Sequence, residues 1–202
     1  MFSRAVLALL GLGIAVPLVA AACLGNSGGP QARTSSDGAE GIPSVASSWN
    51  TNWAKRSIDL EELRAGIPRD DPRDAIPPID APQFETVAEA GDWLAEREPV
   101  LLFQTRGEAR AYPLQILTWH EVVNDEVNGV PVAITFCPLC NTGLVFDRTV
   151  QGQVLRFGTS GLLRSSDLVM WDDKTESLWQ QITGEAIVGD LTGATLEFLP
   201  SS

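Results

Sequence analysis

The chain has 202 residues, with 26 acidic against 14 basic side chains, so its formal charge at pH 7 is -12. This excess of negative charge repels phosphate groups, which argues against nucleic acid as a partner and against basic patches as a means of binding lipid headgroups. The chain holds only three cysteines and one histidine. Few side chains are therefore available for soft-metal binding or nucleophilic catalysis.

Residues 1–22 predict a secretory signal peptide. They carry one basic residue, Arg4, and an apolar run to Ala22 that Pro17 interrupts. The run is also long enough for a retained membrane helix, but the small residues before Cys23 and the glycine-rich sequence after it favour cleavage. Residues 19–23 resemble a bacterial lipobox, with Ala20 where leucine is usual. We therefore expect an extracytoplasmic protein anchored to the cell membrane through lipidated Cys23, or a secreted protein if Cys23 is not lipidated.

Residues 23–57 are expected to form a lipidated tether, and residues 58–202 a folded domain. Up to Ser48 the composition is mainly glycine, serine, alanine and proline, which cannot bury enough apolar surface to offset the entropy of ordering. The domain is long enough to bury a core of its own. Its short elements predict one α+β domain, mostly antiparallel sheet with a few short helices.

The first part of this domain predicts two helices. Ser57 can cap a short helix that ends near Gly66. The proline-rich stretch 67–82 predicts an irregular segment on the surface. Residues 85–96 carry spaced apolar residues after an acidic start, which predicts a second helix.

Turn residues then predict hairpins and short strands. The pair Arg106-Gly107 separates residues 100–103 from residues 109–112, and Asn128-Gly129 separates two further strands, the second of which ends at Cys137. Between these hairpins Pro113 can begin a short helix that carries His120 and extends to residue 123. The sequence after Cys140 predicts only short strands.

Cys137 and Cys140 are the strongest candidates for a functional site. Two thiolates three positions apart can bind one soft metal ion, and the proline between them favours a tight turn. A closed zinc shell needs more ligands, and His120 is the predicted third. Glu121 and Asp125 are candidates for orienting the histidine or for supplying an oxygen ligand. The metal expected from this set is zinc or monovalent copper.

Two other roles remain open for the cysteine pair. As a dithiol, it could perform thiol–disulfide exchange, with Cys137 attacking and Cys140 resolving, if a nearby dipole lowers the pKa of one thiol. The residues after Cys140 predict a turn and a strand, whereas thioredoxin-like motifs begin a helix there. Alternatively, the pair is structural, in a non-catalytic interaction module. Asp147, Asp167 and the pair Asp172-Asp173 could bind a hard cation or act as acid and base, but a solvated turn explains Asp172-Asp173 more simply.

Several ordered motifs resemble the prokaryotic domain-of-unknown-function family numbered 3179, over about residues 58–202. They lie at residues 66–70, 76–80, 111–113, 119–125, 135–142 and 165–172. The resemblance implies no activity, because the family has no established reaction. It does imply that related chains continue past the position of Pro200, so the domain is expected to be truncated at its C-terminus.

Overall fold

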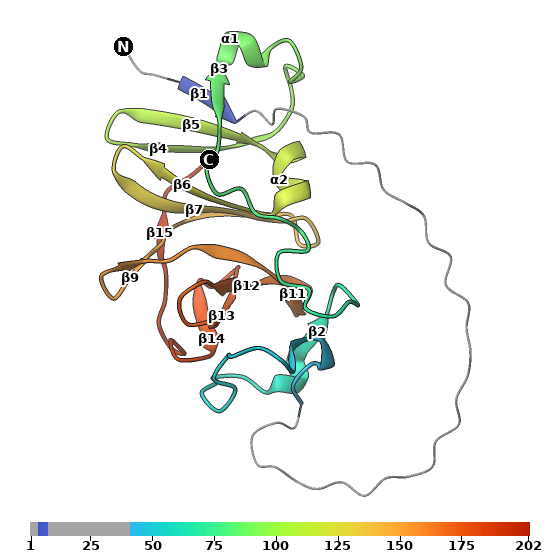
Figure 1. Ribbon diagram of the computed structural model, residues 1–202. Coiled ribbons are helices and arrows are strands. Elements are labelled where there is room, and N and C mark those ends of the chain that lie inside the picture. Colours follow the sequence, from blue (N-terminus) through green and yellow to red (C-terminus); the bar gives the residue numbers. More distant parts are fainter. Residues whose placement is uncertain (1–3, 8–40) are drawn as a thin grey trace, which may run out of the picture.

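The computed structural model describes residues 4–7 and 41–202, which fold mainly into β-strands (Figure 1). Of the described residues, 43% lie in strands and 10% are helical, and the described α-helices are α1 (Val87–Ala90) and α2 (Leu114–His120). The α+β class expected from the sequence is therefore wrong, and the fold is predominantly β. Described strands pair antiparallel, as expected, except for one parallel pairing between β1 and β5.

Three sheets and one small hairpin contain the described strands. The first sheet has the order β3 (Phe84–Thr86), β1 (Arg4–Leu7), β5 (Glu108–Pro113) and β4 (Val100–Thr105). The second has the order β15 (Glu197–Leu199), β8 (Thr142–Asp147), β7 (Val130–Cys137) and β6 (Val122–Val127). The third has the order β14 (Glu185–Val188), β13 (Leu178–Gln180), β12 (Asp167–Asp172), β11 (Phe157–Arg164) and β2 (Leu63–Ala65). The small hairpin pairs β9 (Thr149–Val150) with β10 (Gln153–Val154).

The second sheet lies between the other two, as the two faces of strand β7 show. Side chains of a strand alternate between the two faces of its sheet. Val132, Ile134 and Phe136 pack into a core shared with the first sheet and α2. Ala133 and Cys137 pack into a core shared with the third sheet. Cys137 therefore points into the layer between the second and third sheets.

A third core covers the far face of the third sheet and begins before residue 58. Short 3-10 helix η1 (Ser44–Ala46) buries Ala46 completely, and Trp49 and Trp53 are 6% and 9% exposed. These side chains pack with residues of strands β12 to β14. The sequence expects a flexible tether up to residue 57, but residues 46–53 contribute to the folded core because two tryptophans supply large apolar surfaces.

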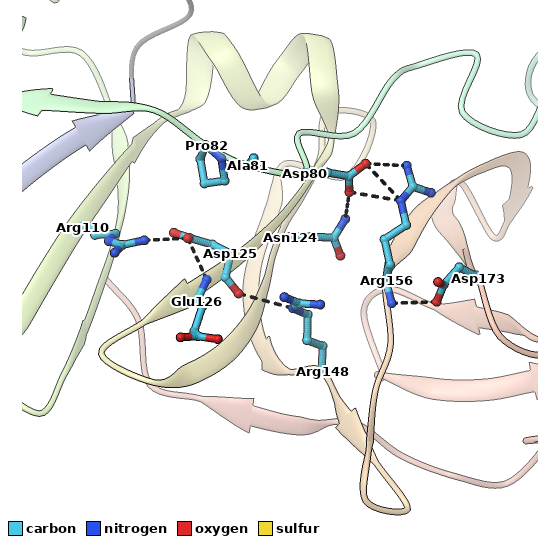
Figure 2. A pocket seen from close by; sticks show the side chains of 10 residues that line it. All are labelled: Asp80, Ala81, Pro82, Arg110, Asn124, Asp125, Glu126, Arg148, Arg156 and Asp173. Carbon is cyan, nitrogen blue, oxygen red and sulfur yellow. Dashed lines mark hydrogen bonds and ion pairs between the residues drawn. The ribbon is translucent and has the colours of Figure 1, made fainter.

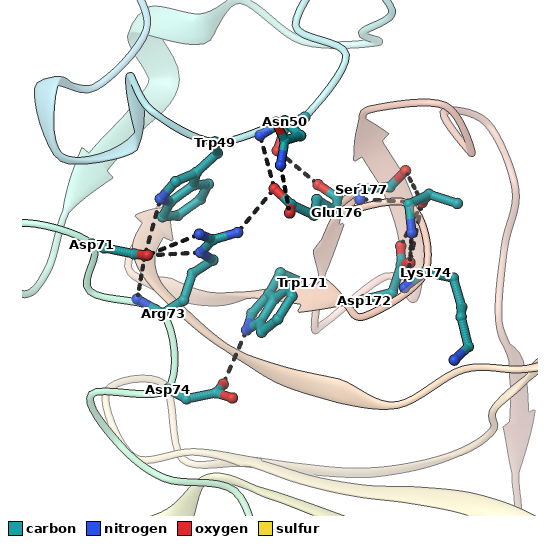
Figure 3. Close-up of polar contacts among 12 residues, drawn as sticks. Trp49, Asn50, Asp71, Arg73, Asp74, Trp171, Asp172, Lys174, Glu176 and Ser177 are labelled. Carbon is teal, nitrogen blue, oxygen red and sulfur yellow. Dashed lines mark hydrogen bonds and ion pairs between the residues drawn. The ribbon is translucent and has the colours of Figure 1, made fainter.

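Arg73 joins this N-terminal part to the third sheet (Figure 3). Its guanidinium carbon lies 4.9 Å from the ring centre of Trp49 and 5.2 Å from that of Trp171. The same guanidinium forms ion pairs with Asp71 at 2.8 Å and with Glu176 at 2.9 Å. These contacts hold the irregular segment 67–82 against the sheet, where the sequence predicts a surface segment.

Both helices predicted before residue 100 are largely absent. Asp59, rather than Ser57, caps a single 3-10 turn, η2 (Leu60–Glu62), and β2 follows at once. In place of the helix over 85–96, α1 spans four residues that begin after Thr86, whose side chain forms a capping box with Glu89. The apolar residues of this stretch do not form a buried face, because Val87 is 56% exposed.

The predicted hairpins are confirmed. Strands β4 and β5 meet at Arg106-Gly107, and β6 and β7 meet at Asn128-Gly129. All four turn residues have positive φ, which a two-residue hairpin turn of this kind requires. The helix expected from Pro113 is present as α2 but ends at His120, because Val122 already belongs to β6.

Candidate metal centre

The cysteine pair lies at the turn between β7 and β8. Cys137 is the last residue of β7 and pairs with Thr142 across the turn. Cys137 is 1% exposed, whereas Cys140 is exposed, and both thiols are free. Asn141, directly after Cys140, has φ of 53°, which reverses the chain into β8. The strand end predicted for Cys137 is therefore confirmed.

Asp167 reaches the cysteines from the third sheet. The turn between β11 and β12 places Ser165 and Ser166 at positive φ, directly before Asp167. One carboxylate oxygen of Asp167, Oδ1, lies 3.4 Å from the Cys140 sulfur. The sulfur of Cys137 lies 3.9 Å from the Ser166 carbonyl oxygen. Ligand atoms of Cys137, Cys140 and Asp167 all lie within 4.8 Å of one another.

The orientation of Asp167 is fixed by its other oxygen. Oδ2 accepts hydrogen bonds from the backbone N–H of Ile182, at 3.0 Å, and from the side-chain amide of Gln180. Asp167 is 4% exposed. These bonds leave Oδ1 directed at the sulfur of Cys140, as is typical of carboxylates held by outer-shell partners at metal sites.

Burial controls the protonation of Cys137. Its pKa is raised to about 12, first because desolvation disfavours the thiolate and then because Cys140 lies beside it. The thiol–disulfide alternative required a dipole that lowers the pKa of one thiol, and the pKa of Cys137 is raised instead. Cys137 is therefore a thiol at neutral pH unless a cation compensates the charge of its thiolate.

Two sulfurs and one carboxylate oxygen suit a tetrahedral metal with one free position. Zinc–sulfur bonds near 2.3 Å and zinc–oxygen bonds near 2.0 to 2.2 Å separate such ligand atoms by about 3.5 to 3.8 Å. The 3.4 Å distance between Cys140 and Asp167 is close to that range. A fully occupied structural zinc site has four protein ligands, whereas three ligands are typical of sites that bind water or substrate.

His120 does not belong to this cluster. It ends α2, and its Nδ1 lies 2.7 Å from the carbonyl oxygen of Pro77. Because a carbonyl oxygen only accepts hydrogen bonds, Nδ1 carries the proton in the neutral ring. The structure thus brings Cys137 and Cys140 together with Asp167, and it gives the predicted third ligand, His120, a different contact.

Glu121 lies next to the cysteine turn, although it is not in the cluster either. It lines a cavity of about 310 Å³ together with Pro138 and Leu139, which precede Cys140. Burial raises the pKa of the Glu121 carboxyl group to about 7. Its backbone has φ of 56°, a conformation that costs a non-glycine residue about 1 kcal/mol or more.

Asp125 lies in a different part of the molecule (Figure 2). It is 6% exposed and accepts hydrogen bonds from Arg110, at 2.6 Å, and from the hydroxyl group of Tyr112, at 2.7 Å. Burial, together with the Asp125 charge, raises the pKa of Tyr112. Asp125 and Arg110 line an open pocket of about 610 Å³ together with Arg148. The contacts of Asp125 stabilise the packing of β5 against β6 and do not orient a ligand of the cysteine cluster.

Sequence reasoning considered Asp167 as a ligand of a hard cation or as an acid or base, and not as a partner of the cysteine pair. The signal that could have found it is the Ser165-Ser166 turn, because a tight turn at the start of a strand places the next side chain at the edge of a sheet. Cys23, the predicted lipidation site, lies outside the described residues. Strand β1 falls within the predicted signal peptide. Within residues 4–7 and 41–202, no helix has the length and apolar character needed to cross a membrane.

Comparison with known proteins gives one family. Residues 73–202, more than half of the chain, match the family model described as protein of unknown function (DUF3179). Searches of curated proteins and of solved structures each found no match. The matched region contains the cysteine turn and the turn that delivers Asp167. The chain therefore belongs to the DUF3179 family, which agrees with the resemblance seen in its motifs.

Proposed function

We propose that the protein binds one thiophilic metal ion through Cys137, Cys140 and Asp167, in an extracytoplasmic domain tethered to the membrane by its lipidated N-terminus. The metal site rests on one observation: three ligand atoms, supplied by two separate hairpin turns, lie within 4.8 Å of one another. The tether and the compartment are supported by the signal sequence and lipobox pattern of residues 1–23. A storage, delivery or sensing role fits such a domain.

The ligand chemistry favours zinc over monovalent copper. Copper(I) prefers soft thiolate and thioether ligands, whereas zinc accepts thiolate, imidazole and carboxylate ligands alike. The third ligand is a carboxylate, so zinc is the expected ion. A bound cation also removes the electrostatic obstacle to ionising Cys137, because its charge stabilises a buried thiolate.

Metal analysis of protein purified under reducing conditions tests this proposal. We expect near-stoichiometric zinc in the wild-type protein, and almost none in the Cys137→Ser/Cys140→Ser double variant. Asp167→Asn should lower zinc affinity by about 10- to 100-fold. Glu197→Gln changes an exposed carboxylate elsewhere and serves as the control. Wild-type protein that folds and binds neither zinc nor copper would refute the proposal.

Thiol–disulfide exchange is a second candidate, because the exposed thiol of Cys140 lies beside that of Cys137. For this candidate we reverse the order of attack predicted from the sequence, because the buried, protonated Cys137 is a poor nucleophile. Cys140 would attack a substrate disulfide and release one substrate thiol. Cys137 would then attack the Cys140 sulfur, releasing the second thiol and closing the internal disulfide.

An insulin-reduction assay separates the candidates. Activity in the metal-free protein that disappears in Cys140→Ser supports exchange. If the double cysteine variant folds normally and the wild-type protein shows neither metal nor activity, the pair is structural and the interaction-module interpretation remains.

A further inference from the structure

The cavity beside the cysteine turn has apolar walls and is large enough for a small ligand. Its volume of about 310 Å³ is at the lower end of the range for ligand pockets. The wall residues come from the segment that follows β2 and from strands β11 and β12, and they are mainly aliphatic: Gly66, Ile67, Ile76, Leu162, Leu163 and Leu168. Pro138 and Leu139 extend this apolar surface toward Cys140, and the side chain of Leu139 is exposed.

The polar side chains of the cavity offer acceptors and no free donors. Thr118 already donates its hydroxyl proton to the Leu114 carbonyl oxygen, at 2.7 Å. Thr159 donates its proton to the Ile76 carbonyl oxygen, at 2.8 Å. The ionised carboxylate of Glu121 can only accept. A ligand that satisfies these groups must itself supply hydrogen-bond donors.

Glu121 is held in place by its backbone. Its N–H donates to the Leu117 carbonyl oxygen at 2.7 Å, and its own carbonyl oxygen accepts from Phe136 at 2.8 Å. These two bonds maintain the unfavourable positive φ at the end of α2. Burial alone perturbs the pKa of this carboxyl group, which means that no described cation or donor compensates its charge. A cation that enters the cavity would supply such compensation.

We propose that this cavity binds a primary alkylammonium group, with the ammonium against the Glu121 carboxylate and the alkyl chain along the aliphatic walls. An ammonium head carries three donors and a positive charge, which matches a lining of acceptors in a protein of formal charge -12. The site is independent of the metal proposal, since none of the three metal ligands lines the cavity.

Hexylammonium chloride is a suitable probe, followed by amide chemical shifts of the full chain at a pH of about 8. We expect shifts at cavity residues such as Gly161 and Leu168, with a dissociation constant in the millimolar range. Hexanol should bind about tenfold more weakly and hexanoate not at all, because neither supplies the cationic head.

Two variants make the result decisive. Glu121→Gln should weaken hexylammonium binding at least about tenfold and leave hexanol binding unchanged, whereas the control Glu197→Gln should change neither. The Cys137→Ser/Cys140→Ser variant should bind the amine as the wild-type protein does. Equal affinity for hexanol and hexylammonium, unchanged binding by Glu121→Gln, or loss of binding in the cysteine variant would each overturn the proposal. A failure of the metal site alone leaves these results unaffected.

Discussion

Glu121 gives the protein a pH-dependent stability that one substitution removes. Burial raises the pKa of its carboxyl group from 4.5 to about 7, because the ionised form loses water without gaining a charged partner. Replacing Glu121 with Gln preserves the size of the side chain and removes its charge. Folding of the variant therefore buries no charged carboxylate at this position.

The direction and size follow from proton linkage. Between pH 4.5 and about 7 the folded protein holds a proton that the unfolded chain has released, so the stability contributed by this group falls as pH rises. A rise in pKa of this size corresponds to about 3 kcal/mol, at about 1.4 kcal/mol for each tenfold change in proton affinity. Glu121 is half-buried, and water screens part of this energy, so we expect a loss of about 2 kcal/mol.

Urea unfolding at pH values of about 5 and 8 measures this loss in the wild-type protein, in Glu121→Gln and in the control Glu197→Gln. The free energy of unfolding of Glu121→Gln relative to wild type should rise by about 2 kcal/mol between the two pH values. The control should follow the wild type. If the wild type and Glu121→Gln show the same pH dependence, the carboxylate is solvated and the reasoning about the cavity fails.

Three further experiments test other parts of the structure. Cys140 should react with iodoacetamide at least about tenfold faster than Cys137, read by mass spectrometry, because only Cys140 is exposed; equal rates would show that the turn opens freely. Asp125→Asn should lower the free energy of unfolding by about 3 kcal/mol, since Tyr112 and the Arg110 guanidinium lose a buried charged acceptor. A loss below about 1 kcal/mol would show that the Asp125 carboxylate is solvated. Arg73→Ala should cost about 2 kcal/mol and change tryptophan fluorescence, as two indole contacts and two ion pairs disappear; an unchanged spectrum would contradict the stacking.

The hairpins were predictable because their signals are local. Arg106-Gly107 and Asn128-Gly129 require positive φ, and a turn of this type fixes the pairing of the strands beside it. The helix over 85–96 was not predictable in the same way. Its spaced apolar residues suggest a buried face, yet Trp93 is 41% exposed and β3 takes the first two residues of the stretch. Pairing within the sheet outweighs a weak helix propensity there.

The candidate site was half predictable for the same reason. Cys137 and Cys140 lie three residues apart, so their proximity follows from the chain itself. Asp167 lies 27 residues after Cys140, and its position depends on how the third sheet packs on the second. His120 was the expected ligand because it is the single histidine, and residue chemistry alone carries no information about such packing.

The two turns that form the candidate metal centre belong to different layers of the fold. An ion bound by Cys137 and Cys140 on one side and by Asp167 on the other would cross-link those two layers. Removing the ion would leave this edge closed by side-chain packing around Leu168 and by the hydrogen bonds that Gln181 donates to Thr135 and to the Thr142 carbonyl oxygen. Occupancy of the centre would then govern how readily the two layers separate, and the protein could report the supply of metal through its own resistance to unfolding and proteolysis.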